Sequence, residues 1–215
     1  SDAFSQSKQQ TMEAFGAEVI VEESYGKGIT PELIERMKDK ALSLCDNSNA
    51  YYADQFGSPD VTLGYEPMGQ EIANSLDRNI DIFCASVGTG GAIMGAWQGL
   101  VRSDTKVSVV AFEPLQSPFL TTGKGGAHKV EGIGVGFDPP FLDRAALSDI
   151  RTIDQDLGFS MCRRLAKEEG IFCGASTGLN VVGAIELAKE MKPEQTVVTL
   201  ACDSGLKYLG SHIYI

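Results

Sequence analysis

Three apolar runs that lack polar alternation constrain the fold more than any other feature of this sequence. They cover residues 80–87, 107–112 and 197–201. A strand with one solvated face alternates apolar and polar residues, so continuous apolar runs indicate a sheet that is covered on both faces. Segments with helical spacing separate the runs, which favours parallel pairing. The sequence therefore predicts a doubly wound α/β fold with a mostly parallel sheet, in which ligands bind at the carboxyl ends of the strands.

A glycine, a serine and a proline at positions 57–59 mark the predicted boundary between two lobes. Residues 1–57 would form a smaller N-terminal α/β lobe and residues 58–215 a larger α/β lobe. In the smaller lobe we expect a helix over 5–15, a short strand over 17–21 and a second helix capped by Thr30. In the larger lobe the expected helices cover 66–76, 93–101, 154–169 (capped by Asp154) and 179–191.

The charge and the cysteine content exclude several classes of function. The chain has 18 Lys and Arg against 29 Asp and Glu, a net charge of −11, which argues against nucleic acid and anionic membranes as partners. No apolar segment has the length of a membrane span. The five cysteines form no Cys/His cluster, so we expect no metal site. They indicate buried thiols in a reducing compartment, the cytoplasm.

The strongest local feature is the segment Gly88-Thr89-Gly90-Gly91-Ala92, between a predicted strand and a predicted helix. Glycines let backbone amides approach an anion, and a helix start offers free N–H groups at the positive end of its dipole. Thr89 can add a hydroxyl. These residues predict a phosphate-binding loop, and the alternative is a tight turn that binds nothing.

The same loop leaves open a nicotinamide-dependent oxidoreductase that binds NAD. Gly88 and Gly90 fit the start of the dinucleotide fingerprint, but Ile93 stands where the third glycine belongs. Glu113 ends the next strand, where an acid that binds ribose would lie. Only this partial fingerprint supports the hypothesis.

Three further segments contain residues suited to ligand contacts. Residues 132–137 alternate glycine with apolar residues and predict a flexible loop. Residues 174–178 precede a helix, so Ser176 or Thr177 is expected to cap it, with an anion site as the alternative. The Asp-Ser-Gly turn at 203–205 follows the last strand, where cofactor contacts and ordinary turns both occur.

Taken in this order, these segments resemble the cysteine synthase (O-acetylserine sulfhydrylase) and cystathionine β-synthase family of pyridoxal-phosphate-dependent enzymes of fold type II. Any single motif is weak, but the ordered set is specific and covers nearly the whole chain. Further stretches that carry the resemblance are Gln55-Phe56, Glu113-Pro114, Ser117-Pro118, residues 128–134, Arg164-Leu165-Ala166, residues 168–171 and Tyr208-Leu209.

The resemblance implies pyridoxal phosphate as the cofactor. It places the phosphate against the backbone amides of residues 88–92, where Ala92 stands in place of the family's usual threonine. It assigns Ser204 to a hydrogen bond with the pyridine nitrogen and Ser176 to a polar position near the cofactor. The larger lobe would then be the cofactor-binding lobe.

For the substrate, the resemblance implies β-replacement, in which an activated serine loses its β-substituent and a thiol or sulfide adds, giving cysteine or a related amino acid. Gln55 would lie near the substrate carboxylate, and Gly132 and Gly134 in a loop near its amino group. The family is usually homodimeric, so the expected partners are an amino-acid substrate and a second copy of the chain.

The family's Schiff-base lysine has no counterpart among the lysines of this chain, because its position would precede Ser1. The catalytic residue is therefore unknown. Lys124 and Lys129 lie in the long loop before residue 140, where solvated lysines are expected. We expect a chain that is trimmed at its N-terminus, keeps only the remainder of the smaller lobe and is inactive alone. A non-catalytic homologue with a binding or regulatory role is the alternative.

Overall fold

The structure, a computed structural model, describes residues 1–2, 6–26, 30–46 and 49–214. It divides the chain into two compact units, Ser1–Asp54 and Gln55–Ile215. The division lies close to the glycine, serine and proline at positions 57–59. The assignment of these units to the two predicted lobes stays a prediction.

The described part of the first unit contains the helices α1 (Gln6–Ala14) and α2 (Pro31–Asp46). Thr30 caps α2 as predicted, because its Oγ1 accepts a hydrogen bond from Leu33 N at 3.3 Å. The strand predicted over residues 17–21 is wrong, since this segment has no strand structure. Ile20 and Val21 are exposed there. A β-rich run becomes a strand only where a neighbour satisfies its backbone groups, and the described residues offer none.

The second unit is built on a four-stranded sheet with the order β3-β2-β1-β4, in which every neighbouring pair is parallel. The strands are β1 (Ile82–Ser86), β2 (Ser108–Pro114), β3 (Asp149–Ile153) and β4 (Val197–Thr199). The predicted α/β class with a parallel sheet is confirmed. The edge strand β3 was not predicted, since its residues include the charged Asp149 and Arg151 and form no continuous apolar run.

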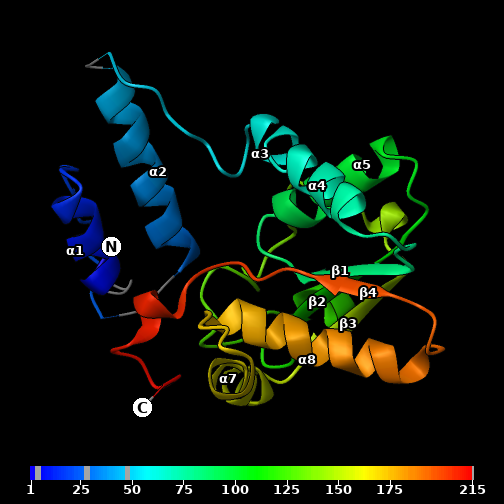
Figure 1. The fold of residues 1–215 in the computed structure, drawn as a ribbon. Coiled ribbons are helices and arrows are strands. Elements are labelled where there is room, and N and C mark those ends of the chain that lie inside the picture. The colour runs from blue at the N-terminus through cyan, green and yellow to red at the C-terminus, as the bar shows by residue number, and fades with distance from the viewer. Residues whose placement is uncertain (3–5, 27–29, 47–48, 215) are drawn as a thin grey trace. The chain divides into compact units, whose positions relative to one another are not determined.

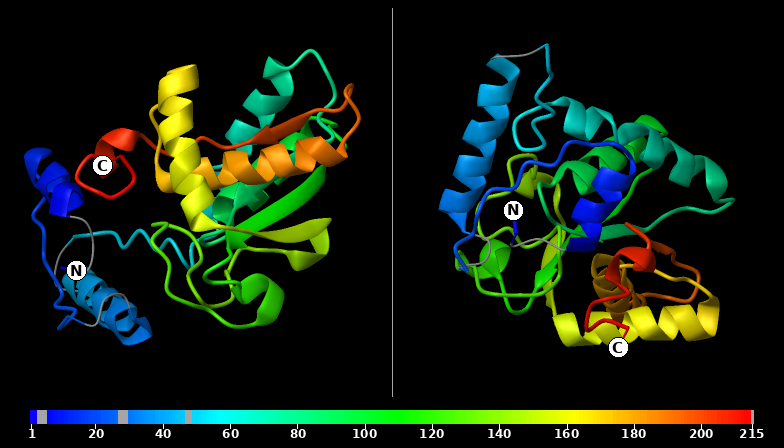
Figure 2. Two further views of the ribbon diagram at one scale, coloured as in Figure 1. Left: turned by 90° about the horizontal axis from the view of Figure 1, so that it is seen from below. Right: turned by 90° about the vertical axis from the view of Figure 1, so that its left-hand side faces the viewer.

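Helices cover both faces of the sheet (Figure 1, Figure 2). One face carries α4 (Glu66–Ser75) and α5 (Gly91–Arg102), and the other carries α7 (Gln155–Arg164) and α8 (Ala175–Glu190). Asp154 caps α7 as predicted, with its Oδ1 accepting from Asp156 N at 2.7 Å. The shorter elements are α3 (Asp60–Leu63), α6 (Phe119–Thr122), a π-helical turn at Leu165–Glu169, and 3-10 turns at Arg144–Ala146 and Gly205–Tyr208.

The sheet has an apolar core on each face, which explains the continuous apolar runs. Successive residues of a strand point to opposite faces. On β1, Phe83 and Ala85 belong to the core beneath α4 and α5, whereas Cys84 belongs to the core beneath α7 and α8. On β2, Ala111 and Phe112 divide between the two cores in the same way. All five side chains are buried.

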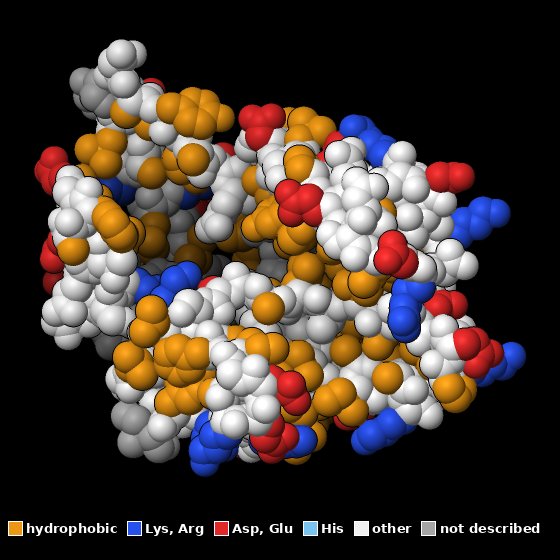
Figure 3. Space-filling view, in the orientation of Figure 1, with side chains coloured by type: hydrophobic (Ala, Val, Ile, Leu, Met, Phe, Trp, Pro, Cys, Tyr) orange, Lys and Arg blue, Asp and Glu red, His pale blue; other side chains and the backbone are white. Residues whose placement is uncertain are grey.

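The surface and the helix lengths give two further observations. No helix in the described ranges is both long and apolar enough to cross a membrane. On the face drawn in Figure 3, Lys and Arg side chains are scattered among acidic ones and do not gather into a patch. This face therefore lacks the basic stripe that nucleic-acid-binding proteins present.

The chain reverses its progress across the sheet between β1 and β4. It first moves from β1 through α5 to β2 and on to β3, and then returns through α7 and α8 to β4 on the opposite side of β1. In open α/β sheets, ligands bind at such a switch point, outside the carboxyl ends of the two strands. The segments that follow β1 and β4 are therefore the candidate site.

Candidate functional site

The loop after β1 ends at the start of α5, whose N-cap is a glycine and so has no capping side chain of its own. Gly90 is the N-cap of α5 and has a φ of 88°, in the left-handed region that favours glycine. Thr89 Oγ1 accepts a hydrogen bond from Gly91 N at 3.3 Å. Unpaired N–H groups and the positive end of the helix dipole make such a start suitable for an anion.

The glycines of this loop also meet protein atoms. A Cβ on Gly88 would lie 2.3 Å from the carbonyl oxygen of Gly132, and a Cβ on Gly90 would lie 2.7 Å from the backbone N of Leu142. Both distances are too short for any side chain. Close packing of the loop on its own protein therefore explains these two glycines, in addition to the approach of an anion or a tight turn predicted from the sequence.

The segment 128–136 lies against the end of β1. Gly134 N donates to Val87 O at 3.0 Å, and Gly134 O lies 3.0 Å from His128 Nε2. Because His128 Nδ1 accepts from Val130 N at 3.3 Å, Nε2 carries the proton and donates to Gly134 O. The expected flexible loop is instead a hydrogen-bonded segment beside the candidate phosphate loop.

The turn after β4 is anchored on both of its sides. Ser204 and Cys173 form an antiparallel bridge. The hydroxyl oxygen of Ser204 accepts from Leu206 N at 3.2 Å, and the Ser204 side chain is exposed. Asp203 Oδ2 accepts from the Tyr208 hydroxyl at 2.9 Å. The turn thus presents the predicted cofactor residue Ser204 at the carboxyl edge of the sheet.

Ser176 and Thr177 lie inside the first turn of α8, so the prediction that one of them caps the helix is wrong. The N-cap is Gly174, and no side chain in the described chain caps this helix. Thr177 Oγ1 instead accepts from Cys202 N at 2.9 Å, because the segment after β4 runs past the helix start. Ser176 is buried at 7% exposure in the same turn.

Asn180 carries little sequence signal, yet it connects the two strand ends. It is fully buried. Its Oδ1 accepts from Ser86 N at 2.7 Å, and its Nδ2 donates to Leu200 O at 2.9 Å. The one available signal is an amide side chain among the apolar residues of α8.

Glu113 caps the start of a helix with its carboxylate. Its buried carboxylate accepts hydrogen bonds from Leu120 N at 2.6 Å, Thr121 N at 2.9 Å and Thr121 Oγ1 at 2.7 Å. These groups belong to the start of α6, where a carboxylate is favoured. Glu113 is therefore engaged and cannot serve as the ribose-binding acid, which removes this support for the dinucleotide hypothesis.

The predicted substrate residues are only partly brought together. Gly132 and Gly134 share the segment beside β1. The ring of Phe56 lies 5.8 Å from the ring of Phe137, so the chain next to Gln55 reaches the end of that segment. Gln55 itself is exposed. A small hollow nearby is lined by Val87, Glu113, Phe119, Leu120, Gly134, Val135, Gly136, Phe137 and Pro139.

The lysines of the long loop do not form part of this arrangement. Lys124 and Lys129 are both exposed, as the sequence predicts for solvated loop lysines. Lys129 N donates to the side chain of Gln155 at 2.8 Å, which involves its backbone only. Neither lysine is therefore assigned as the catalytic residue.

Burial shifts several pKa values next to the site. Desolvation raises the pKa of the Cys84 thiol to about 12 and also raises the pKa of Cys202. The prediction that Cys202 is a buried residue is nevertheless wrong, since it is exposed. Burial, together with the hydrogen bond to Asp203, raises the pKa of Tyr208. These groups are therefore neutral at physiological pH and contribute no charge to the site.

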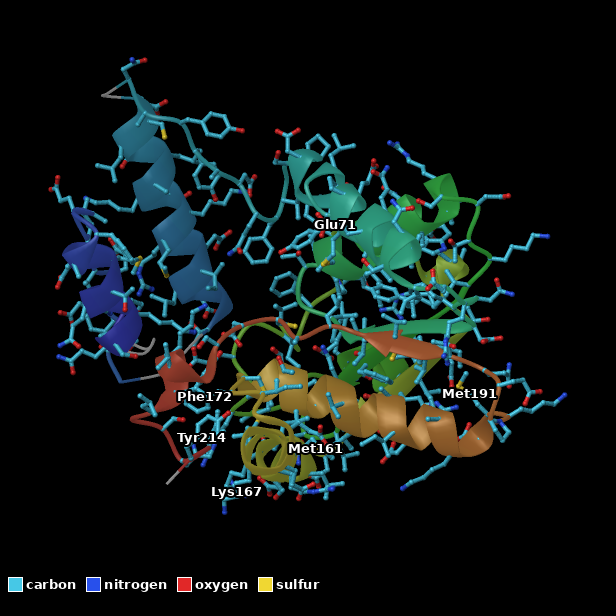
Figure 4. All side chains as sticks on the ribbon, viewed as in Figure 1. Glu71, Met161, Lys167, Phe172, Met191 and Tyr214 are labelled. Atoms are coloured by element: carbon cyan, nitrogen blue, oxygen red, sulfur yellow. The ribbon has the colours of Figure 1, made fainter. Side chains whose placement is uncertain are left out.

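An aromatic pair supports the segment before α8. Figure 4 shows Phe172 and Tyr214 side by side, and their ring centroids lie 4.7 Å apart. The Tyr214 hydroxyl donates to Cys173 O at 2.5 Å, and burial raises the pKa of Tyr214 to about 12. Since Cys173 is the bridge partner of Ser204, this pair stabilises the backbone on which the Ser204 turn rests.

The fold and these two segments define a doubly wound α/β protein whose switch point lies between a helix start with a glycine N-cap and a polar turn. Residues 1–203 match the model of the family described as pyridoxal-phosphate dependent enzyme. The chain belongs to this family, whose cofactor is pyridoxal phosphate, and the resemblance inferred from the sequence is confirmed.

Known proteins of this family are similar over nearly the whole chain. A cysteine synthase from Staphylococcus aureus is 34% identical, with 99% of this chain and 67% of the relative covered. A hydrogen sulfide-producing enzyme from Fusobacterium nucleatum has a TM-score of 0.87 at 31% identity, with 99% and 64% covered. An O-acetylserine dependent cystathionine β-synthase from Helicobacter pylori has a TM-score of 0.84 at 35% identity, with 99% and 68% covered. The chain thus spans about two thirds of the length of these relatives.

Proposed function

We propose that this chain forms the cofactor-binding part of a pyridoxal-phosphate-dependent enzyme of β-replacement, which joins an activated serine with sulfide or a thiol to give cysteine or a related amino acid. The observation that carries the proposal is the pairing of a helix start that has a glycine N-cap, after β1, with a polar turn after β4 at the switch point. The names of the relatives, cysteine synthase and O-acetylserine dependent cystathionine β-synthase, support this substrate class.

The amides of residues 88–92 would hold the cofactor phosphate. The helix dipole favours the negative charge there. Thr89 Oγ1 already accepts a hydrogen bond from Gly91 N, so its proton is left for a phosphoryl oxygen. Ala92 offers its amide alone. The chemistry of these donors suits a phosphate.

Ser204 would donate a hydrogen bond to the pyridine nitrogen. Its oxygen accepts from Leu206 N, which leaves the hydroxyl proton for an acceptor on the ligand. When bound, pyridoxal phosphate supplies an electron sink for charge on the substrate's α-carbon. A neutral hydroxyl makes this ring less electron-withdrawing than a carboxylate partner would, which suits β-replacement. Ser176, buried in the first turn of α8, would lie near the cofactor.

The substrate residues have different roles in this proposal. Gln55 would bind the substrate carboxylate. Both backbone groups of Gly134 are engaged, by Val87 and His128, so Gly134 would shape the loop that Gly132 shares near the amino group. We also propose a homodimer in the cytoplasm, where the five free cysteines would stay reduced.

The test is equilibrium binding of pyridoxal phosphate to the chain and to Thr89→Ala. A hydrogen bond to a charged group contributes about 1.5–3 kcal/mol, so the variant should bind roughly 10-fold or more weakly. Thr105→Ala, at the other end of α5, is the matched control and should bind as the wild type does. A wild-type chain that binds no pyridoxal phosphate refutes the proposal. Cofactor binding by the complete protein without cysteine formation from O-acetylserine and sulfide favours the non-catalytic alternative.

A further inference from the structure

β1 and β4 separate just before the candidate site. Their parallel pairing ends at Cys84 and Thr199, where Thr199 Oγ1 donates to Cys84 O at 2.8 Å. On its other side, β1 stays paired with β2 to the end, since Val87 N still donates to Phe112 O at 3.0 Å. The strands therefore part only at the switch point.

The side-chain amide of Asn180 occupies the place where the strands part. Ser86 N is a donor and Leu200 O is an acceptor, so the amide can face them in one orientation only, with Oδ1 toward β1 and Nδ2 toward β4. The second N–H of Nδ2 points to Cys202 Sγ at 3.6 Å. Because Asn180 is fully buried, water does not compete for these bonds.

Asn180 contacts both the β1 side and the β4 side of the candidate site, whereas Thr177 on the same helix contacts the β4 side. Thr177, one turn earlier on α8, holds Cys202 N on the β4 side. Asn180 holds Ser86, which precedes the Gly88 loop, and Leu200, which precedes the Ser204 turn. Asn180 thus links the backbone before the loop directly to the backbone before the turn.

We propose that Asn180 is a positioning residue whose amide sets the separation between the loop at 88–92 and the Ser204 turn, so that one ligand with a phosphate and a ring nitrogen contacts both. Asn180 does not touch the ligand. The inference rests on the proposed function, because it assumes that the phosphate binds at the loop and the ring nitrogen at Ser204.

Two ligands distinguish positioning from general stability. Inorganic phosphate needs the loop alone, whereas pyridoxine 5′-phosphate, which lacks the aldehyde and does not react with lysines, needs both segments. The affinities are measured by ³¹P NMR titrations of the 215-residue chain. Asn180→Leu should lower the affinity for pyridoxine 5′-phosphate about 10-fold, which corresponds to the loss of about one hydrogen bond, and should change the affinity for inorganic phosphate by less than about 2-fold. Val182→Ala, in the core beneath α8, is the control and should lower the thermal midpoint without altering either affinity.

A second variant keeps the test decisive if Asn180→Leu does not fold. Asn180→Asp has the same shape, and its neutral carboxylic acid has one acceptor and one donor, as the two strands require. Burial raises a carboxyl pKa. The variant should therefore bind pyridoxine 5′-phosphate more weakly than the wild type at about pH 8 and almost as tightly as the wild type near pH 5.5. The two proteins are compared at the same pH, because the phosphate itself titrates near pH 6. The adjacent Cys202 thiol, whose pKa is raised, stays neutral over this range.

The outcomes separate this inference from the proposed function. If Asn180→Leu loses the same affinity for both ligands, or loses none for either, the positioning role is overturned. It is also overturned if the affinity of Asn180→Asp for pyridoxine 5′-phosphate does not recover at low pH. A wild-type chain that binds neither ligand overturns the proposed function and the inference with it. Selective loss of pyridoxine 5′-phosphate, restored by protonation of the aspartate, supports both.

Discussion

Polar side chains at the carboxyl edge of this sheet bind backbone groups as well as offering contacts to a ligand. Thr177, Asn180 and Glu113 accept backbone N–H groups that the short strands and helix starts leave unpaired. Buried backbone donors need such partners. Thr89 and Ser204 differ from these buried residues in being at least partly exposed, and each accepts one backbone N–H and keeps a hydroxyl proton for another acceptor.

At the residue scale, Ser204→Ala should change the electronic properties of bound pyridoxal phosphate more than its affinity. The phosphate and the helix dipole would supply most of the binding, whereas Ser204 would touch the ring nitrogen alone. The measurement is the absorbance maximum of the bound cofactor together with its dissociation constant. Ser211→Ala is the control, since that hydroxyl donates to Tyr208 O. An unshifted absorbance spectrum would count against the role of Ser204.

A second residue-scale prediction concerns stability. Glu113→Gln should lower the free energy of unfolding by roughly 2 kcal/mol, because a carboxylate that accepts buried N–H groups is replaced by an amide with a donor of its own. Urea denaturation measures this loss. Glu194→Gln, at an exposed position, is the control and should be nearly neutral. Equal stabilities for the two variants would show that the α6 cap contributes little.

At the scale of elements, side chains link β1 and β4 at both the amino and the carboxyl ends of the two strands. Asn180 joins the carboxyl ends. At the amino ends, Asp81 accepts hydrogen bonds from Thr196 N at 2.8 Å and Gln195 Nε2 at 3.2 Å. These contacts lower the pKa of Asp81, and the Thr196 N–H is the largest cause. The two strands share only a short run of backbone hydrogen bonds, and these side chains add contacts between them at both ends of that run.

This arrangement predicts an acid-dependent stability. Because the folded-state pKa of Asp81 is depressed, its contribution is present above the unfolded value of about 3.9 and is lost as the pH falls through the folded value. Asp81→Asn should therefore lower the thermal midpoint near neutral pH and reduce its dependence on pH in the acid range. Circular dichroism melts over that range test this. Asp77→Asn is the exposed control, and wild-type and Asp81→Asn curves that run parallel would contradict the prediction.

At the scale of the whole molecule, the second unit contains every segment of the candidate site. Both buried clusters, with the side chains packed against them, lie between Met68 and Tyr214. The loop after β1 and the turn after β4 belong to the same unit. Among the described residues, both clusters are therefore built from side chains of the second unit.

Residues 55–215, expressed alone, should accordingly fold cooperatively and keep the binding of pyridoxine 5′-phosphate. The thermal midpoint should lie within about 5 °C of that of the full chain, a shift that corresponds to roughly 1–2 kcal/mol. Circular dichroism and ³¹P NMR titration measure both properties. A broad, non-cooperative melt would show that the first unit contributes to the core.

The local sequence determined the parallel α/β sheet, the caps of α2 and α7, and the position of the loop at 88–92. Each of these follows from neighbouring residues. Apolar runs report burial on both faces, Thr30 and Asp154 bond amides within their own helix, and glycines mark a turn between a strand and a helix. The resemblance to the cysteine synthase family rests on the same ordered segments.

The tertiary structure alone decided which polar groups meet. The run at 17–21 forms no strand, whereas β3, which contains charged residues, pairs with β2. Glu113 turns to the start of α6, and Asn180 bridges Ser86 and Leu200 from a helix far from both in sequence. The physical reason is that a backbone N–H or C=O takes its partner from whatever packs against it, and that neighbour is set by the fold and not by adjacent residues.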